Sequence, residues 1–198
     1  MKTAGVLLIS LFMLMACSQK KDIDKYNSLV KAELASNKRV DSIFFGFHFG
    51  MVQKAFYMHC WEMNQKGILT DGNDATGNMT VLYKLPKELK YPASMNFFPD
   101  FQDSIIWKMR VDFRYDGWVP WNKGLGADSL LPEVLAMYKK WYNVGNPFIQ
   151  VDDEKRGTVY VKVDGNRRIT IKKYDDVFVK ADYTDMLAEK KIKRKDGK

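Results

Sequence analysis

The sequence predicts an α+β fold, in which an antiparallel sheet carries two main helices packed on one face. Two segments, 52–66 and 130–144, gather their apolar residues on one side at helical spacing. Each is followed by several short segments in which apolar and polar residues alternate, the pattern of half-buried strands. Gly67 and Gly145 follow the two helices and lie 78 residues apart. The repeated plan leaves two interpretations open: a tandem α-β-β-β duplication, or one irregular domain with two helices.

The first half of this plan begins at Ile43. From there to Gly50, apolar residues at alternate positions predict a strand. In the helix over 52–66, Phe56 and Met63 belong to the apolar side, and Gly67 suits the left-handed position that ends a helix. Three strands are expected to follow, over 79–85, 93–98 and 104–115.

The second half repeats the order of elements. Ser129 is the expected N-cap of the helix over 130–144, and Pro132 is tolerated in the first turn. Asp164-Gly165 is typical of a two-residue hairpin turn. The expected strands are 148–151, 158–163, 167–173 and 177–182.

The N-terminus carries the features of a secretory leader. Lys2 precedes an unbroken apolar run from Ala4 to Ala16, which ends at Cys17. As a helix this run would reach only about 20 Å, short of the roughly 30 Å hydrocarbon core of a bilayer. Residues Leu14-Met15-Ala16-Cys17 resemble the lipobox of bacterial lipoproteins. The resemblance implies cleavage before Cys17, a diacylglyceryl group on its sulfur, and acylation (palmitate or a similar chain) of its freed amine.

The expected lipidation sets the location and the thiol count. The protein would be held in the bacterial envelope by its N-terminal lipid. Ser18 stands where the enterobacterial pattern has the aspartate that retains lipoproteins at the inner membrane, so we expect the outer membrane, facing the periplasm. Cys60 is then the only free cysteine, which excludes an intramolecular disulfide.

Charge and composition divide the chain into four regions. These are a signal peptide over 1–16, a lipidated tether with one short helix over 17–40, an α+β body over 41–185 with possible halves 41–120 and 121–185, and a basic tail over 186–198. The formal charge is +8, but residues 190–198 hold six basic residues against Asp196. The body is nearly balanced, so no nucleic-acid partner is expected. The tail is either solvated or in contact with anionic lipid headgroups.

No group of residues predicts catalysis, a metal site or a cofactor. His59 and Cys60 are adjacent in a helix and diverge by about 100°, and Cys60 belongs to the apolar side, where a thiol packs as a small hydrophobe. His48 is expected on the opposite face of the sheet from His59. The acidic segment 70–78 fails the calcium-loop pattern, because Thr76 stands where glycine is needed. We interpret it as a turn.

The sheet face away from the two helices is the candidate binding surface. Its alternation brings basic and aromatic residues together, and interfaces favour tyrosine, phenylalanine and arginine. The partner would be an envelope protein or an anionic polysaccharide; the alternative is a face that is merely solvated. The candidate residues are Lys108, Arg110, Arg114, Tyr160, Lys162, Arg168, Lys172 and Phe178.

Two short motifs carry a further resemblance. Phe49-Gly50-Met51 enters the first helix, and Gly145-Asn146-Pro147 follows the second. Over about residues 43–182 the chain resembles the outer-membrane-assembly small lipoproteins and the related tandem fold of β-lactamase inhibitor protein. The resemblance implies a binding or assembly module without catalysis.

Two functions are therefore carried forward. The first is a non-enzymatic, lipid-anchored binding or assembly module of the envelope. The second is an envelope carbohydrate-binding or hydrolytic protein, in which Trp118 and Trp121 would form a sugar platform beside two carboxylates. Burial of both tryptophans in the core would exclude the second.

Overall fold

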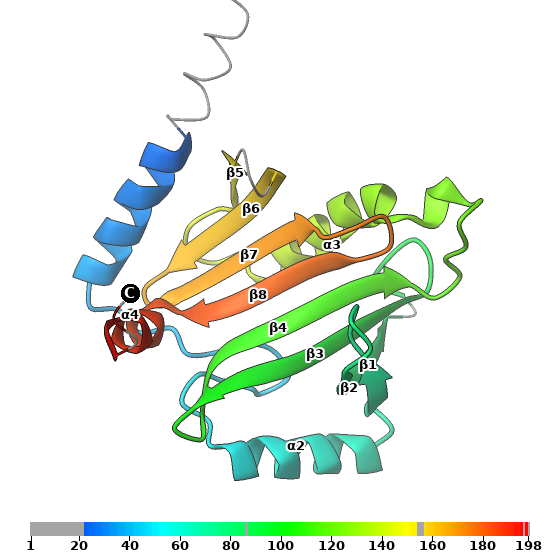
Figure 1. The fold of residues 1–198 in the computed structure, drawn as a ribbon, viewed down its shortest axis with the longest axis horizontal. Coiled ribbons are helices and arrows are strands. Elements are labelled where there is room, and N and C mark those ends of the chain that lie inside the picture. The colour runs from blue at the N-terminus through cyan, green and yellow to red at the C-terminus, as the bar shows by residue number, and fades with distance from the viewer. Residues whose placement is uncertain (1–21, 86, 154–156, 196, 198) are drawn as a thin grey trace, which may run out of the picture.

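One open antiparallel sheet with helices packed against it forms this α+β protein (Figure 1). The computed structural model describes residues 22–85, 87–153, 157–195 and 197. The expected signal peptide and Cys17 lie outside these residues. Within them, a first helix covers 22–35, as expected for the tether.

Each half of the body is a helix followed by four strands. The first half holds α2 (Gln53–Gln65), β1 (Leu69–Asn73), β2 (Met79–Leu85), β3 (Ala93–Gln102) and β4 (Ile105–Tyr115). The second holds a 3₁₀ turn (Lys123–Leu125), α3 (Ala127–Trp141), β5 (Ile149–Asp153), β6 (Gly157–Asp164), β7 (Arg167–Lys173) and β8 (Val179–Asp185). A last helix, α4, spans Met186–Lys195.

The strand order, β1-β2-β3-β4-β8-β7-β6-β5, makes the two halves topological copies. Each half is a meander, and the last strands of the two meanders, β4 and β8, pair in the centre of the sheet. The repeated unit is thus α-β-β-β-β, one strand more than the predicted α-β-β-β repeat, because β1 of the first half was not predicted. The outermost strands, β1 and β5, are also the shortest, at five residues each.

A single apolar core fills one face of the sheet across both halves. Leu130, Val134 and Tyr138 recur at four-residue spacing on α3 and are fully buried. The Tyr138 ring lies 5.9 Å from the rings of both Phe113 in β4 and Tyr183 in β8. The buried residues of α2 belong to the same cluster. The two main helices therefore share one face, as predicted.

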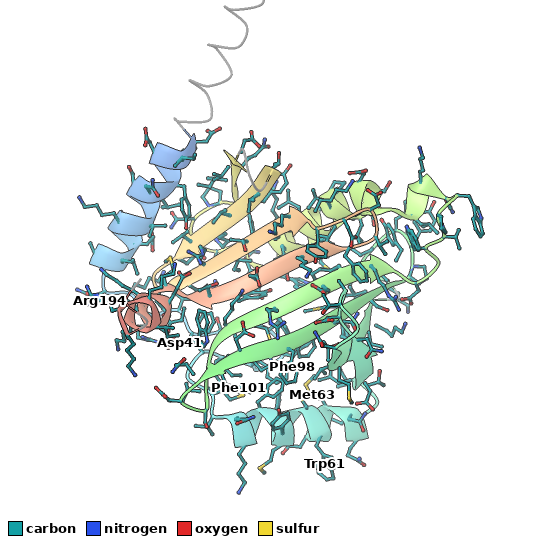
Figure 2. All side chains as sticks on the ribbon, viewed as in Figure 1. Asp41, Trp61, Met63, Phe98, Phe101 and Arg194 are labelled. Atoms are coloured by element: carbon teal, nitrogen blue, oxygen red, sulfur yellow. The ribbon has the colours of Figure 1, made fainter. Side chains whose placement is uncertain are left out.

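The end of α2 follows the sequence closely. Gly67 has a φ of +67°, and the amides of Gly67 and Ile68 donate to the carbonyls of Asn64 and Met63. This is the double hydrogen bond of a Schellman motif. Figure 2 shows Met63 turned toward the sheet and Trp61 turned away from it.

The predicted strand over 43–50 is wrong. Phe45 and Gly46 have φ angles of +50° and +82°, and the Ile43 amide donates to the Phe47 carbonyl over 2.9 Å. The segment is a tight turn that places Phe44 and Phe47 in the core. Most of the alternating apolar residues are buried because the turn packs several aromatic rings into the core. The same alternation is expected of a strand, so the pattern alone does not distinguish the two. Consequently His48 and His59 do not flank a sheet.

Strand β1 was expected to be part of a turn. Its Asp71-Gly72 sequence is typical of turns, but the segment pairs with β2 over five residues. A Cβ at Gly72 would lie 2.3 Å from Asn96 Oδ1 and 2.8 Å from Leu82 Cβ. Glycine is therefore needed here for close approach of the neighbouring strands, not for chain reversal.

Two boundaries in the second half also differ. Helix α3 begins after Gly126, not Ser129, and the Ala127 amide donates to the Asp176 carbonyl in the β7–β8 turn. The β6–β7 hairpin loop is Gly165-Asn166, one residue later than predicted, because Asp164 still pairs with Arg167 in the ladder. The start of α3 depends on a contact with the β7–β8 turn, which is distant in sequence. The position of the hairpin loop depends on Asp164, which is buried and still paired in the ladder.

The expected basic tail is a helix. Asp185 Oδ1 accepts hydrogen bonds from the amides of Leu187 and Ala188, so Asp185 caps α4. Met186 is buried, and Glu189 pairs with Arg168 of the sheet at 3.1 Å. These contacts fix the first turns of α4, while its basic residues Lys190, Lys191, Arg194 and Lys195 stay exposed.

Candidate functional site

The sheet face opposite α2 and α3, here called the open face, is built from β3, β4, β8 and β7 at its centre. In Figure 1 it is turned toward the viewer, with α3 behind the sheet. The strand register sets its side chains in rows across the strands. Its charged and polar residues are Ser94, Asn96, Asp100, Lys108, Arg110, Asp112, Arg114, Arg168, Thr170, Lys172, Lys180, Asp182 and Thr184.

Five of the predicted binding residues lie on this face. Lys108, Arg110 and Arg114 come from β4, and Arg168 and Lys172 from β7. Phe178 lies in the turn before β8, where its carbonyl accepts from the Tyr174 amide over 2.9 Å.

Tyr160 and Lys162 belong to the opposite face. Lys162 is only 1% exposed, and its ammonium donates to the carbonyls of Val144 and Asn146 and to Asp164. The valines of β6 occupy the open side of that strand instead. The prediction placed the apolar side of β6 toward the main core, but that side is covered by a different helix.

The helix over 22–35 covers this end of the open face. Its apolar residues Tyr26, Leu29, Val30 and Leu34 pack against a separate buried cluster formed by Val151, Val161, Val163 and Met186. Arg168 links the helix to the sheet and to α4, since its guanidinium donates to Tyr26 Oη at 3.3 Å and to Glu189 at 3.1 Å. The expected tether is therefore partly a wall of the site.

Carboxylates neutralise most of the basic residues. Lys108 lies 3.2 Å from Asp182, and Arg110 lies 2.8 Å from Asp100. Lys180 is 3.9 Å from Asp112. The face is thus a mosaic of ion pairs, not the basic patch that the candidate residues alone suggest. The same alternation that identifies the lysines and arginines also places Asp100, Asp112 and Asp182 on this face.

Burial and ion pairing shift the pKa in opposite directions at two carboxyls of the site, Asp112 and Glu189. Burial raises the pKa of Asp112, although the Ala75 amide donates to it over 2.8 Å and Lys180 lies nearby. Burial would also raise the pKa of Glu189, but the Arg168 guanidinium outweighs it and holds that pKa below the usual value. Glu189 is therefore a stable anion of the site.

Two cavities hollow the open face. The larger, about 450 Å³, lies between the helix over 22–35, the sheet and α4. The smaller, about 250 Å³, lies under the β1–β2 turn and includes Asp74, Arg110 and Tyr174. Lys108, Lys172 and Asp182 line both cavities, which are therefore neighbours on this face.

The other candidate chemistry is occupied by local contacts. Burial raises the pKa of Cys60 to about 12, so its thiolate is disfavoured. His59 Nε2 lies 2.6 Å from the Phe45 carbonyl, and His48 Nδ1 lies 2.9 Å from the Phe49 carbonyl. Among the described residues, no three histidine, cysteine or carboxylate side chains are grouped as metal ligands.

The acidic segment 70–78 ends in a turn closed by one carboxylate. Asp74 Oδ1 accepts hydrogen bonds from the amides of Thr76 and Asn78 over 2.8 and 2.9 Å. Burial opposes ionisation here, but these and the side-chain bonds lower the pKa of Asp74 to about 2. The turn interpretation of this segment is confirmed from Asp74 onward, whereas residues 69–73 form β1.

Comparison with protein-family models, with curated proteins and with solved structures finds no match to this chain. Across the described ranges, none of the helices combines the length and apolar character needed to cross a membrane.

Proposed function

We propose that this protein is a non-enzymatic, lipid-anchored binding or assembly module of the bacterial envelope, and that its open face receives an envelope partner. The expected lipobox at 14–17 supports the anchor, as does the leader before it. At least two acyl chains would hold it firmly at a membrane, on the outer membrane facing the periplasm. The proposal includes the resemblance of residues 43–182 to the outer-membrane-assembly small lipoproteins and to the fold of β-lactamase inhibitor protein, which implies a binding or assembly role.

One observation carries the proposal: the centre of the open face is left free by α2 and α3 and is hollowed by two neighbouring cavities. Concave surfaces with both charges in fixed positions suit recognition of a partner with complementary charges. Because Asp100, Asp112 and Asp182 each face a cation, the geometry favours an envelope protein over an anionic polysaccharide. The same ion pairs engage these three aspartates of the open face, which acid and base catalysis on this face would need.

A second candidate, carbohydrate binding or hydrolysis, is favoured by the exposure of Trp121, which is 83%. Trp118 is half-buried, so burial does not remove this pair as a sugar platform. Neither tryptophan lines the two cavities of the open face. Turnover of an envelope polysaccharide by the purified protein, lost on replacing one named carboxylate, would establish this function instead.

Site-specific photocrosslinking in native envelopes tests the binding proposal. A benzoylphenylalanine at Tyr174, an exposed residue of the smaller cavity, should form a discrete adduct with one envelope protein. The matched control is the same probe at Trp61, which is exposed on α2 and points away from the sheet (Figure 2). Arg110→Glu should reduce the Tyr174 adduct about tenfold, the effect of losing one charged contact.

The outcomes separate the alternatives. An adduct at Trp61 but not at Tyr174 would move the interface to α2 and contradict the proposal. Cys17→Ala should abolish acyl labelling, release the protein from membranes and remove the adduct. Unchanged labelling and membrane association in that variant would overturn the anchor.

A further inference from the structure

The larger cavity of the open face has two chemically different sides. One side is apolar and consists of Ile23 and Tyr26 from the helix over 22–35, with Val151, Val159 and Val161 from β5 and β6. The other side comes from β4, β7, β8 and α4 and is polar except for Trp107. At about 450 Å³, the cavity falls in the range of small-molecule sites.

The polar side carries more cations than anions. Among the residues that the structure describes, Lys108, Arg168, Lys172 and Lys193 line it together with two carboxylates, Asp182 and Glu189. Lys108 pairs with Asp182, and Arg168 and Lys193 share Glu189. Among the described residues, no carboxylate lies within ion-pair distance of Lys172. Within the part of the chain that the structure describes, Lys172 is therefore the cation of this cavity that a ligand anion would find without a carboxylate partner.

The apolar side gives the other half of the ligand. Val151 and Val161 are buried beneath the helix, and Val159 and Tyr26 are half-buried at the edge of the cavity. Ile23, near the start of the helix, is 38% exposed, so the apolar wall extends to solvent. An alkyl chain laid along this wall would remove apolar surface from water at about 25 cal/mol per Å².

The wall is also close in sequence to the expected anchor. Asp22 begins the helix that carries Ile23 and Tyr26 and follows Cys17 by five residues. Five residues reach at most about 18 Å when fully extended. If the proposed lipidation holds, the cavity is confined close to the membrane surface, where single-chain amphiphiles are available. The nearness of the cavity to the membrane rests on the proposed function, whereas the apolar and polar sides of its lining do not.

We propose that this cavity binds a single-chain amphiphile with a carboxylate head, of the fatty-acid class. The head group lies at Lys172, and the chain lies against Val159, Val161 and Ile23. Binding is reversible and non-covalent. The ligand would thereby share the open face with the envelope partner, because Lys172 also lines the smaller cavity.

Calorimetric titration with matched single-chain probes tests the site. The protein used is the chain from Ser18 onward, which keeps every described residue. Decanoate below its micellar concentration should bind saturably with one site per chain. Decyltrimethylammonium, with the same chain and opposite charge, should bind about tenfold more weakly or not at all, as expected for loss of one charged contact.

Three variants assign the contacts. Lys172→Glu should weaken decanoate about tenfold and reverse the preference between the two probes, and Val159→Ser should weaken both probes alike. Lys139→Glu, on the exposed side of α3, is the charge-matched control and should change neither affinity. An unfolding transition like that of the unsubstituted chain shows that each variant is folded.

Absence of saturable binding, equal affinity for the two probes, or a folded Lys172→Glu variant with unchanged affinity would each overturn the amphiphile site. The Tyr174 crosslink would be untouched by such a result, so the binding-module proposal would stand. Conversely, decanoate binding without any crosslinked partner would support the cavity and contradict the module.

Discussion

Lys162 shows how a single buried charge can organise a part of the fold. Its ammonium contacts two carbonyls in the segment that follows α3 and also the carboxylate of Asp164. The same carboxylate pairs with Arg167 at 3.3 Å. Asp164 in turn accepts from the Asn146 amide over 2.8 Å. A Cβ at Gly145 would lie 2.3 Å from the Asp164 carboxylate, so glycine is required there. This network joins the end of α3 to the β6–β7 hairpin.

Lys162→Met should lower the free energy of unfolding by about 3–5 kcal/mol, because it leaves buried polar groups without their cation. Urea denaturation at neutral pH measures the loss. Lys173→Met is the matched control: its partners Asp128 and Asp176 are exposed, so the cost should be below about 1 kcal/mol. A loss for Lys162→Met no larger than for the control would show that the network contributes little.

At the scale of elements, sequence periodicity identified the two main helices and most strands. Strand β4 has the clearest alternation, and Met109, Val111, Phe113 and Tyr115 are buried as that pattern requires. Periodicity failed where burial did not arise from a regular element, as in the turn at Phe45, and where an element is polar, as in β1. It also cannot state which helix covers which strand face.

That last limit explains the partial success at the site. Rows of side chains on β4 and β7 could be predicted from alternation alone, which placed Arg110 and Lys172 correctly. The side of β6 could not, because its valines are buried by the helix over 22–35. Pairing of Arg168 with Glu189 depends on α4, whose start at the Asp185 cap was missed. An Asp before Met-Leu-Ala-Glu is the signal that could have identified it.

The contact of α4 with the sheet predicts a pH dependence. The pKa of Glu189 is below its usual value of 4.5 in the folded protein, so its contribution to stability is complete above that value and is lost as pH falls through the lower folded pKa. Glu189→Gln should therefore cost about 1–2 kcal/mol at pH 7 and much less near pH 3. Urea denaturation of both proteins at the two pH values measures this difference.

Glu62→Gln on the exposed side of α2 is the control and should alter the free energy of unfolding at neither pH. A loss for Glu189→Gln that is the same at pH 7 and pH 3 would mean that its effect comes from packing and not from its charge.

For the whole molecule, the two topological halves share one core, so we expect them to fold as one unit. The core cluster runs from Ile43 to Tyr183 without a break between halves. The central strands β4 and β8 pair over Lys108–Phe113 and Val179–Thr184. Separating the halves would expose both of these strand edges together with the apolar face that α2 and α3 cover.

Neither fragment 41–120 nor fragment 121–185 should fold alone. Each should give a poorly dispersed amide NMR spectrum, whereas the intact chain should unfold in one cooperative transition by circular dichroism and by tryptophan fluorescence. A well-dispersed spectrum from either fragment, or two separate transitions in the intact chain, would show that the halves are independent domains.

The two outer strands bear on how crowded copies of this protein behave. Any open sheet offers unpaired amides and carbonyls at its margins, and such margins invite copies to add strand to strand into fibrils. Here β1 and β5 are only five residues long, and each carries aspartate, including Asp71 and Asp152. Brevity and negative charge at both margins would resist polymerisation when many copies share one surface. Under the proposed lipid anchor, we expect the protein to reach high density on a membrane and to remain dispersed.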